Sequence, residues 1–188
     1  APWQVVAITF TDKAADELKN RLEAKLGEIG HDVWALTFHG TCVRILRRCA
    51  DRLGFPNSFT IYDQADSLSV MKRILRDMNM DDKVFPPKAM LAAAGRYKGS
   101  LVSPEEAVAA EERSGDIRRI RTAKIYAAYA KHLQDAGAMD FDDLIYYTVR
   151  LLQDEPDVLA YYQKKFRYVL IDEYQDTNHL QYLFAALM

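Results

Sequence analysis

The chain has 188 residues, of which 49% are apolar and 28% are charged, and its formal net charge is −2. This composition is ordinary for a soluble globular protein, and the length suits one domain or one domain with a sizeable insertion. The near-neutral charge excludes the strongly basic class of nucleic-acid-binding proteins, although a local groove can still be basic on a neutral protein.

Cys42 and Cys49 are the only two cysteines, and they lie seven residues apart in one helical pattern. On a helix they would be separated by about 10 Å of rise, which is too far for a disulfide. We find no signal peptide and no apolar run long enough to span a bilayer. A reducing, cytoplasmic setting without a membrane partner is therefore predicted.

Short apolar runs at residues 5–10 and 33–38 are typical of parallel strands that are buried on both faces. Between them, an alanine and three leucines recur every four residues and predict a helix over residues 13–26. Thr11 is a possible N-cap of this helix, and Gly27 is its predicted stop. The strand–helix–strand order predicts an α/β fold.

The long middle of the chain carries helix signals and almost no strand signal before a third predicted strand at residues 168–171. Helices are predicted at 42–53, 63–78, 87–97 and 116–134, and further helix starts are predicted at the capping box of Ser103 and at Asp140. About a hundred residues of helix are far more than one crossover between parallel strands needs. We therefore expect an all-helical subdomain at residues 40–138, inserted into an α/β domain made of residues 1–39 and 139–188.

Polar side chains follow all three predicted strands, in Thr9-Phe-Thr-Asp12, Thr37-Phe-His-Gly40 and Asp172-Glu-Tyr-Gln-Asp176. In an open parallel sheet, ligands bind beyond the carboxyl ends of the strands, so these groups could line one surface. Asp172 at such a tip can hold Mg²⁺, and Glu173 can orient or deprotonate a water for attack on a γ-phosphate. On the strand and acidic pair alone, a solvated turn explains the two carboxylates equally well.

Longer motifs carry a resemblance to a known family. Asp172-Glu-Tyr-Gln-Asp-Thr-Asn178 resembles the Walker B motif of the UvrD/Rep/PcrA family of superfamily 1 DNA helicases. Ile8-Thr-Phe-Thr-Asp-Lys-Ala-Ala15 resembles that family's motif Ia, and Thr37-Phe-His-Gly40 resembles its motif Ib. Met139-Asp-Phe-Asp-Asp-Leu144 resembles the segment that returns from the inserted helical subdomain to the first motor domain. The four motifs follow the family's order across nearly the whole chain.

The resemblance implies part of the first motor domain of an ATP-dependent DNA helicase, with a partial RecA-like P-loop NTPase sheet. Such a motor moves 3′ to 5′ on single-stranded DNA and unwinds duplexes, in DNA repair or replication. Its cofactors would be ATP and Mg²⁺. Its partners would be single-stranded DNA, junctions of single strand and duplex, and a second motor domain of the same protein.

The resemblance also implies roles for single residues. Asp172 would hold Mg²⁺, Glu173 would be the catalytic base, and Gln175 would join them in binding the nucleotide. Phe10 would stack against a base, because stacking on an aromatic ring tolerates any base sequence. The residues near the DNA backbone would be Thr9, Thr11, Thr37 and His39.

Two features depart from the family pattern. Asp12 stands where the family commonly carries Asn, and a carboxylate that faces phosphate would repel it. Either Asp12 points away and supports the start of a helix, or the DNA contact there is weaker. The 188 residues also contain no Gly-Lys-Thr loop. The backbone amides and the lysine of that loop bind the phosphates, so we expect these 188 residues alone not to hydrolyse ATP. Both ends of the sequence also look like cuts through a larger protein.

Simpler interpretations remain beside the functional ones. Phe10 and Phe38 follow apolar runs and, without the motifs, are interpreted as core residues. His39 is interpreted as a helix cap or a surface residue. The acidic residues Asp140, Asp142 and Asp143 fit the capping of a helix N-terminus better than a divalent metal site.

A basic cluster in the helical middle leaves two interpretations open. It is either a solvated face or a grip on duplex phosphates, and its members are Arg113, Arg118, Arg119, Arg121 and Lys124. For the whole chain, the alternatives to a helicase are a non-catalytic DNA- or protein-binding module and the motor part of a helicase–nuclease.

Overall fold

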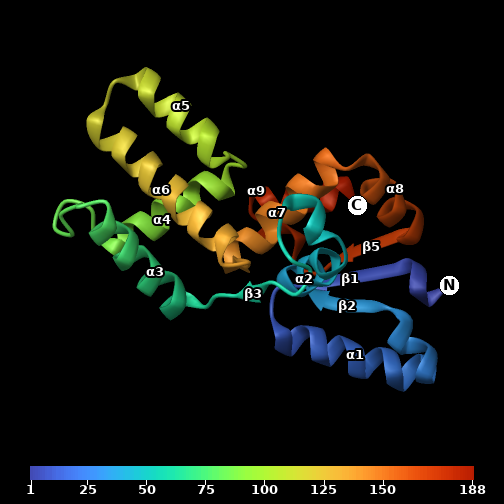
Figure 1. Ribbon diagram of the computed structural model, residues 1–188. Coiled ribbons are helices and arrows are strands. Elements are labelled where there is room, and N and C mark those ends of the chain that lie inside the picture. Colours follow the sequence, from blue (N-terminus) through green and yellow to red (C-terminus); the bar gives the residue numbers. More distant parts are fainter. The chain divides into compact units, whose positions relative to one another are not determined.

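The computed structural model describes residues 1–188, which form two compact units. Unit 1 consists of Ala1–Leu53 and Tyr147–Met188, and unit 2 consists of Gly54–Tyr146. Each unit has its own parallel sheet (Figure 1). Each unit also has its own buried core. No helix has both the length and the apolar composition needed to cross a bilayer.

A three-stranded parallel sheet organises unit 1. Its strand order is β2–β1–β5, with β2 at Trp34–Thr37, β1 at Val5–Thr9 and β5 at Tyr168–Ile171. Ile8 of β1 lies opposite Leu36 on one side and Ile171 on the other. The α/β class and the three predicted strands are confirmed, with β1 and β2 each ending one residue earlier than predicted.

Unit 1 also contains the helices α1 (Asp12–Leu26), α2 (Phe38–Cys49), α8 (Pro156–Lys165) and α9 (His179–Leu187), while α7 (Phe141–Asp154) has residues in both units. The predicted end of α1 at Leu26 is confirmed, and the helix begins one residue earlier than predicted, at Asp12. The Thr11 hydroxyl accepts a hydrogen bond from the Ala14 N–H at 3.2 Å and caps the helix. Gly27 ends it with a φ of 65°, a conformation that glycine adopts without strain.

The start of α2 corrects the sequence prediction. The sequence places Phe38 at the end of a strand and starts the next helix at Cys42, but α2 begins at Phe38. The reason is Thr37, whose Oγ1 accepts the Gly40 N–H at 3.0 Å and so starts the helix directly after β2. A short 3-10 helix at Ala50–Leu53 then follows α2.

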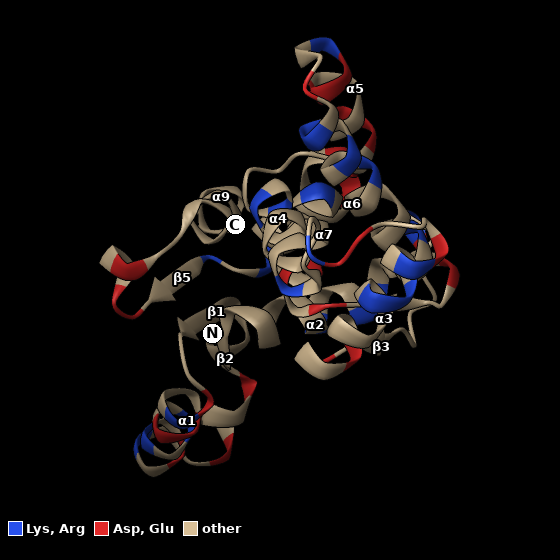
Figure 2. Ribbon diagram, turned by 90° about the vertical axis from the view of Figure 1, so that its left-hand side faces the viewer, with Lys and Arg blue, Asp and Glu red and all other residues tan.

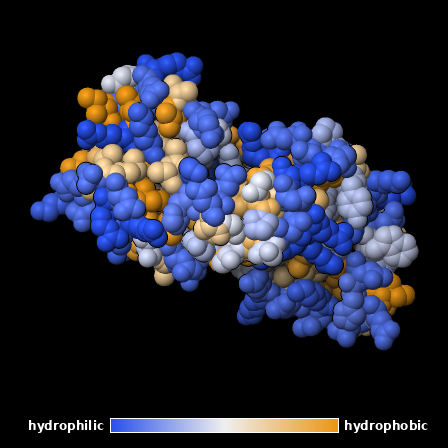
Figure 3. Space-filling view, in the orientation of Figure 1, coloured by the Kyte–Doolittle hydropathy of each residue, from blue (hydrophilic) through white to orange (hydrophobic).

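The core of unit 1 lies against the central strand β1, where Val6 and Ile8 are fully buried. The edge strand β5 differs, because Tyr168 and Leu170 on it are 59% and 58% exposed. Exposed apolar side chains on an edge strand leave part of the sheet uncovered, and further protein can pack on this unfinished face. Elsewhere on the face seen in Figure 3, hydrophilic residues predominate and apolar residues reach the surface in scattered groups.

Unit 2 contains four complete helices, three of which have a polar side chain as N-cap. They are α3 (Gln64–Asp77), α4 (Pro87–Gly99), α5 (Pro104–Ser114) and α6 (Ile117–Asp135). The predicted capping box before α5 is confirmed, since Ser103 Oγ accepts the Glu106 N–H and the Glu106 carboxylate accepts the Ser103 N–H. Tyr126 and Tyr129 of α6 lie in the middle of the buried core.

The expectation of an all-helical subdomain is wrong in one detail. Unit 2 contains a two-stranded parallel sheet of β3 (Thr60–Ile61) and β4 (Ala138–Met139). Two-residue strands are too short to produce a period in the sequence, which explains why pattern reasoning missed them. α2 belongs to unit 1, because it buries Ile45 and Leu46 in the core of that unit. The limits of 40 and 138 for the inserted subdomain stay a prediction.

Gly30 provides a test of the packing that leads into β2. A Cβ atom at Gly30 would lie 2.8 Å from the backbone oxygen of Leu22 in α1, while nothing lies within 4 Å of a Cβ atom at Gly99. Gly30→Ala should therefore lower the free energy of unfolding by about 1–3 kcal/mol. The matched change Gly99→Ala, in a helix, should leave it unchanged or raise it by up to about 1 kcal/mol. Urea unfolding followed by circular dichroism measures both, and equal effects would contradict this account.

Candidate functional site

The carboxyl ends of β1, β2 and β5 meet at one edge of the sheet in unit 1, because the three strands are parallel. The Asp172 N–H donates to the Ile8 carbonyl oxygen at 3.0 Å, so the pairing of β5 with β1 continues to Asp172. Thr9 and Thr37 are paired neighbours at the ends of β1 and β2. The polar residues that the sequence predicted at strand tips therefore share one edge.

Acidic residues gather on the loop after β5, which Figure 2 shows in red. Asp172 and Glu173 are both exposed, and one Asp172 carboxylate oxygen accepts the Glu173 N–H at 3.1 Å. Glu173 has a left-handed backbone with a φ of 49°, which is uncommon for a residue other than glycine. The Gln175 side-chain amide donates to the Glu173 carboxylate. The Glu173 carboxylate is therefore held by a hydrogen bond from another residue of the same loop, Gln175.

A cavity of about 530 Å³ lies beside Asp172, between β1, β5 and α1. Thr9 and Asp172 line it together with Arg21 of α1, while Glu173 and Gln175 do not. Its size is within the range of small-molecule sites. Arg21 is the one basic side chain on its wall, and that guanidinium is also paired with Glu17 at 3.0 Å.

Two of the threonines predicted near DNA also cap helices. Thr11 and Thr37 accept N–H groups at the starts of α1 and α2, so both helices begin at this edge of the sheet. A hydroxyl that accepts a capping bond still has its hydrogen to donate, and a helix start favours anions. Thr9 is different, because its side chain is buried and its hydroxyl donates to the Thr11 carbonyl oxygen at 3.2 Å.

The two phenylalanines separate clearly in the structure. Phe38 is 1% exposed and belongs to the core, as the simpler interpretation holds, whereas Phe10 is 37% exposed. Their ring centroids lie 5.4 Å apart, so Phe38 supports the ring of Phe10 from below. His39 is the second residue of α2 and is partly exposed. Asp12 is the first residue of α1, where the helix dipole stabilises a carboxylate.

The donor set at the tip of β5 suits Mg²⁺ bound to a phosphate. No group of three or more His, Cys, Asp or Glu side chains in the chain could hold a metal ion by itself. Asp172 offers an exposed carboxylate oxygen at a strand end. Mg²⁺ is usually bound by one or two carboxylates and completes its shell with phosphate oxygens and waters, so this donor set fits it.

Comparison with known proteins shows which family this chain belongs to. The family model described as the UvrD/REP helicase N-terminal domain matches residues 1–188. The chain belongs to this family. It is 46% identical over 183 residues to the ATP-dependent DNA helicase PcrA of Bacillus subtilis, a match that covers 97% of this chain. It is 44% identical over its full length to the PcrA helicase of Staphylococcus epidermidis and 43% identical to that of Staphylococcus aureus. The chain spans about a quarter of the length of these relatives.

Unit 2 of this UvrD/REP-family chain contains a buried charge cluster that sequence reasoning missed. Lys98 of α4 is 1% exposed, and its ammonium lies 2.8 Å from Asp140 and 2.7 Å from Asp143. The Tyr129 hydroxyl donates to Asp140 at 2.9 Å. The two aspartates also cap α7 reciprocally, which confirms the capping interpretation made from the sequence. The sequence shows the spacing of Asp140 and Asp143, which predicts the cap. It does not show that Lys98 pairs with them, because Lys98 is far away in the sequence.

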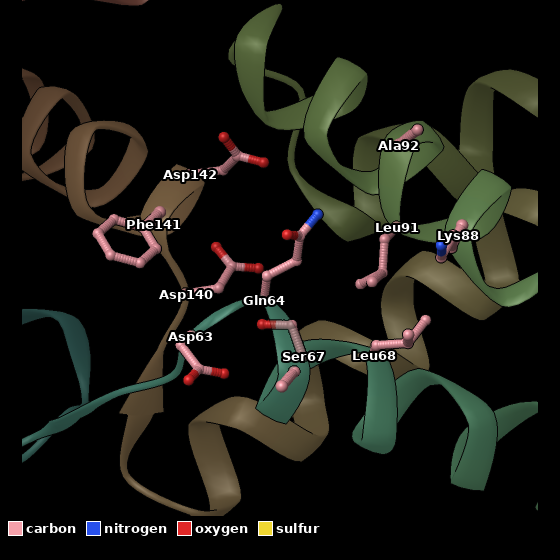
Figure 4. A pocket seen from close by; sticks show the side chains of 11 residues that line it. Asp63, Gln64, Ser67, Leu68, Lys88, Leu91, Ala92, Asp140, Phe141 and Asp142 are labelled. Carbon is pink, nitrogen blue, oxygen red and sulfur yellow. The ribbon is translucent and has the colours of Figure 1, made fainter.

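The charge cluster borders a second cavity, of about 560 Å³, which is drawn in Figure 4. Gln64, Asp140 and Asp142 lie on one side of it, and Lys88 and Leu91 of α4 lie on the other. Phe141 also lines it and is exposed, directly after the Asp140 cap. The exposure of Phe141 is visible only in the structure, so the sequence holds no local signal for this cavity.

The predicted basic cluster of the helical middle is partly neutralised within unit 2. Arg119 pairs with the buried Glu111 at 2.8 Å, and Lys124 pairs with Glu112 at 3.2 Å. Arg118 donates to a backbone carbonyl, that of Val84, at 3.4 Å. These pairs favour a solvated, self-paired face for Arg119 and Lys124.

Because the Asp143 carboxyl is buried, it gains and loses its proton near neutral pH. Burial raises the pKa of the Asp143 carboxyl to about 7, with the charge of Asp140 acting in the same direction and that of Lys98 opposing it. Burial also disfavours the charge on Asp140, but Lys98 and the hydrogen bonds outweigh burial and lower the pKa of Asp140. Because the Asp143 pKa is higher in the folded than in the unfolded chain, folded protein binds the extra proton between these two values.

We therefore expect this group to lower the free energy of unfolding as pH rises from about 4 to about 7, by on the order of 1–3 kcal/mol. Asp143→Asn removes the titration but keeps an oxygen that can accept the Asp140 N–H, so its stability should fall less over this pH range. Urea unfolding of both proteins at several pH values gives the two slopes. Identical slopes would mean that Asp143 is not the titrating group.

Proposed function

We propose that this chain is part of an ATP-dependent DNA helicase that couples ATP hydrolysis to 3′–5′ movement on single-stranded DNA and to duplex unwinding. Unit 1 would be part of its RecA-like first motor domain, and unit 2 its inserted helical subdomain. The family match over residues 1–188 supports this, together with the Asp172-Glu173 pair at the tip of a strand that pairs with β1. The unfinished face of β5 also suits a domain that continues beyond these residues.

In this proposal the loop after β5 acts on the nucleotide. Asp172 would hold Mg²⁺, which when bound with ATP would neutralise charge on the phosphates. Glu173 would take a proton from the attacking water, and Gln175 would keep the Glu173 carboxylate in place by the hydrogen bond that they share. The cavity beside Asp172 offers room for a bound group next to this carboxylate.

The same edge of the sheet would carry the DNA track. Phe10 would stack on a base, supported from below by Phe38. The hydroxyls of Thr11 and Thr37 would donate to phosphate oxygens at the starts of α1 and α2, and His39 would contact the backbone nearby. Thr9 would act indirectly, because its buried hydroxyl holds the Thr11 carbonyl.

Glu173→Gln in the intact protein should lower DNA-stimulated ATP hydrolysis about 10²–10⁴-fold while nucleotide binding is kept. The amide cannot accept the proton, but its oxygen can still accept the Gln175 hydrogen bond, so the loop keeps its shape. Asp172→Ala is the matched change and should instead weaken Mg²⁺-dependent nucleotide binding. Steady-state hydrolysis and nucleotide titration measure the two effects. Near-normal hydrolysis by Glu173→Gln would move the base to another residue.

Phe10→Ala in the intact protein should weaken binding to single-stranded DNA by about 1–3 kcal/mol, with little dependence on base sequence. It should also uncouple ATP hydrolysis from DNA, since the stimulus would arrive through this contact. Phe38→Ala is the control, because Phe38 is buried and its truncation should cost about 3–5 kcal/mol of folding stability. DNA titration beside thermal melting separates the two roles. A Phe10→Ala protein that melts far lower, yet binds single strands normally when folded, would make Phe10 a core residue.

A further inference from the structure

Basic side chains gather at the amino-terminal end of the sheet in unit 1, opposite the edge that carries Asp172. The guanidinium carbon of Arg44 lies 4.1 Å from the ring centroid of Trp34, and the Lys165 ammonium lies 4.7 Å from it. Trp34 is the first residue of β2, and Lys165 is the last residue of α8, just before β5. The positions of both cations are well defined, because each is held by a cation–π contact with the same buried indole ring.

Arg48 extends this group by one turn of α2. It lies four residues after Arg44 on the same helix, and its guanidinium donates to the Tyr161 hydroxyl at 3.3 Å. Burial lowers the pKa of Arg44, and the like charge of Arg48 lowers it further, so the two guanidiniums lie close enough to repel. We refer to Arg44, Arg48 and Lys165 as the α2–α8 cation cluster.

The cation cluster has no acidic partner within the chain. None of its three side chains forms an ion pair. The nearby carboxylates Glu155 and Asp157 are bound by Arg52 at 2.6 and 3.0 Å. The cluster therefore keeps its full positive charge, in contrast to Arg52 on the following turn.

The cation cluster is also rich in hydrogen-bond donors and poor in acceptors. Arginine and lysine side chains are donors only. The buried Tyr162 hydroxyl, whose pKa responds to the charges of Arg48 and Arg44, has no hydrogen-bond partner. Buried polar groups without partners are rare in native proteins, and each calls for a physical reason. An acceptor-rich anion bound at the cluster would supply what is missing.

We propose that the α2–α8 cation cluster is a docking site for an acidic segment of a protein partner, whose carboxylates pair with Arg44 and Arg48. A guanidinium binds a carboxylate through two parallel hydrogen bonds, which gives such a site specificity as well as charge attraction. The free positive charge ends at Arg52, which Glu155 and Asp157 neutralise, so the cluster is short and suits a short acidic segment better than a long phosphate backbone. The site does not depend on the helicase assignment, because it lies at the other end of the sheet.

The probe is a fluorescent peptide of about ten consecutive glutamates, titrated with the intact protein at low ionic strength and followed by anisotropy. The double change Arg44→Gln, Arg48→Gln should raise the peptide Kd at least about tenfold. The matched control is Lys72→Gln, Arg76→Gln, which removes the same charge at the same spacing from an exposed face of α3 and should change the Kd less than about twofold.

A second variant guards against loss of the fold, since Arg44 packs on Trp34. Arg48→Gln alone leaves that contact intact and should still weaken peptide binding, while Arg48→Lys should restore part of it. Failure of the wild-type protein to bind the peptide would overturn the proposal. So would an equal loss in the α3 control, which would indicate general charge attraction. If the cluster variants lost affinity for a single-stranded oligonucleotide but not for the peptide, the site would belong to nucleic acid and the proposal would be wrong.

Discussion

The parallel pairing of β5 with β1 is the constraint on which the candidate site depends. The two strands come from opposite ends of the chain, and their register brings Ile171 beside Ile8. One backbone hydrogen bond, from the Asp172 N–H to the Ile8 carbonyl oxygen, extends this pairing to the first acidic residue. Without it, Asp172 and Glu173 would be two solvated carboxylates on a turn. With it, they lie at the same edge of the sheet as the starts of α1 and α2.

Unit 2 depends on a different interaction, the burial of the Lys98 ammonium between two carboxylates. Removing one buried charge from such a group is costly, whereas an apolar replacement of the whole group can be neutral. Its value is thus better sought in specificity than in net stability. The cluster joins α4 to the start of α7, and Tyr129 ties it to α6. Three helices that could slide along an apolar core are fixed in one arrangement by groups that must meet.

The sequence predicted what is local and missed what is distant. The caps at Thr11 and Ser103 were foreseeable because each is bound within three residues of its own position. The strands of unit 1 were foreseeable from their apolar runs. The pairing of Lys98 with Asp140 was not, because nothing in the spacing of two distant residues indicates contact. The two-residue strands β3 and β4 were missed since they are too short to carry a period.

The residues of the candidate site could be named from the sequence as a prediction, whereas their geometry could not. The motif placed Glu173 in a functional role, yet only the structure gives its left-handed backbone and the side chain of Gln175 that holds it. Likewise, the sequence treated Phe10 and Phe38 alike, and burial alone separates the supporting ring from the exposed one. The threonines carry the same lesson further. Thr11 and Thr37 form capping bonds that start α1 and α2, so the groups proposed to contact DNA also fix the backbone that presents them. In the proposed site, local folding and DNA binding would use the same atoms, so a change at either threonine would alter both.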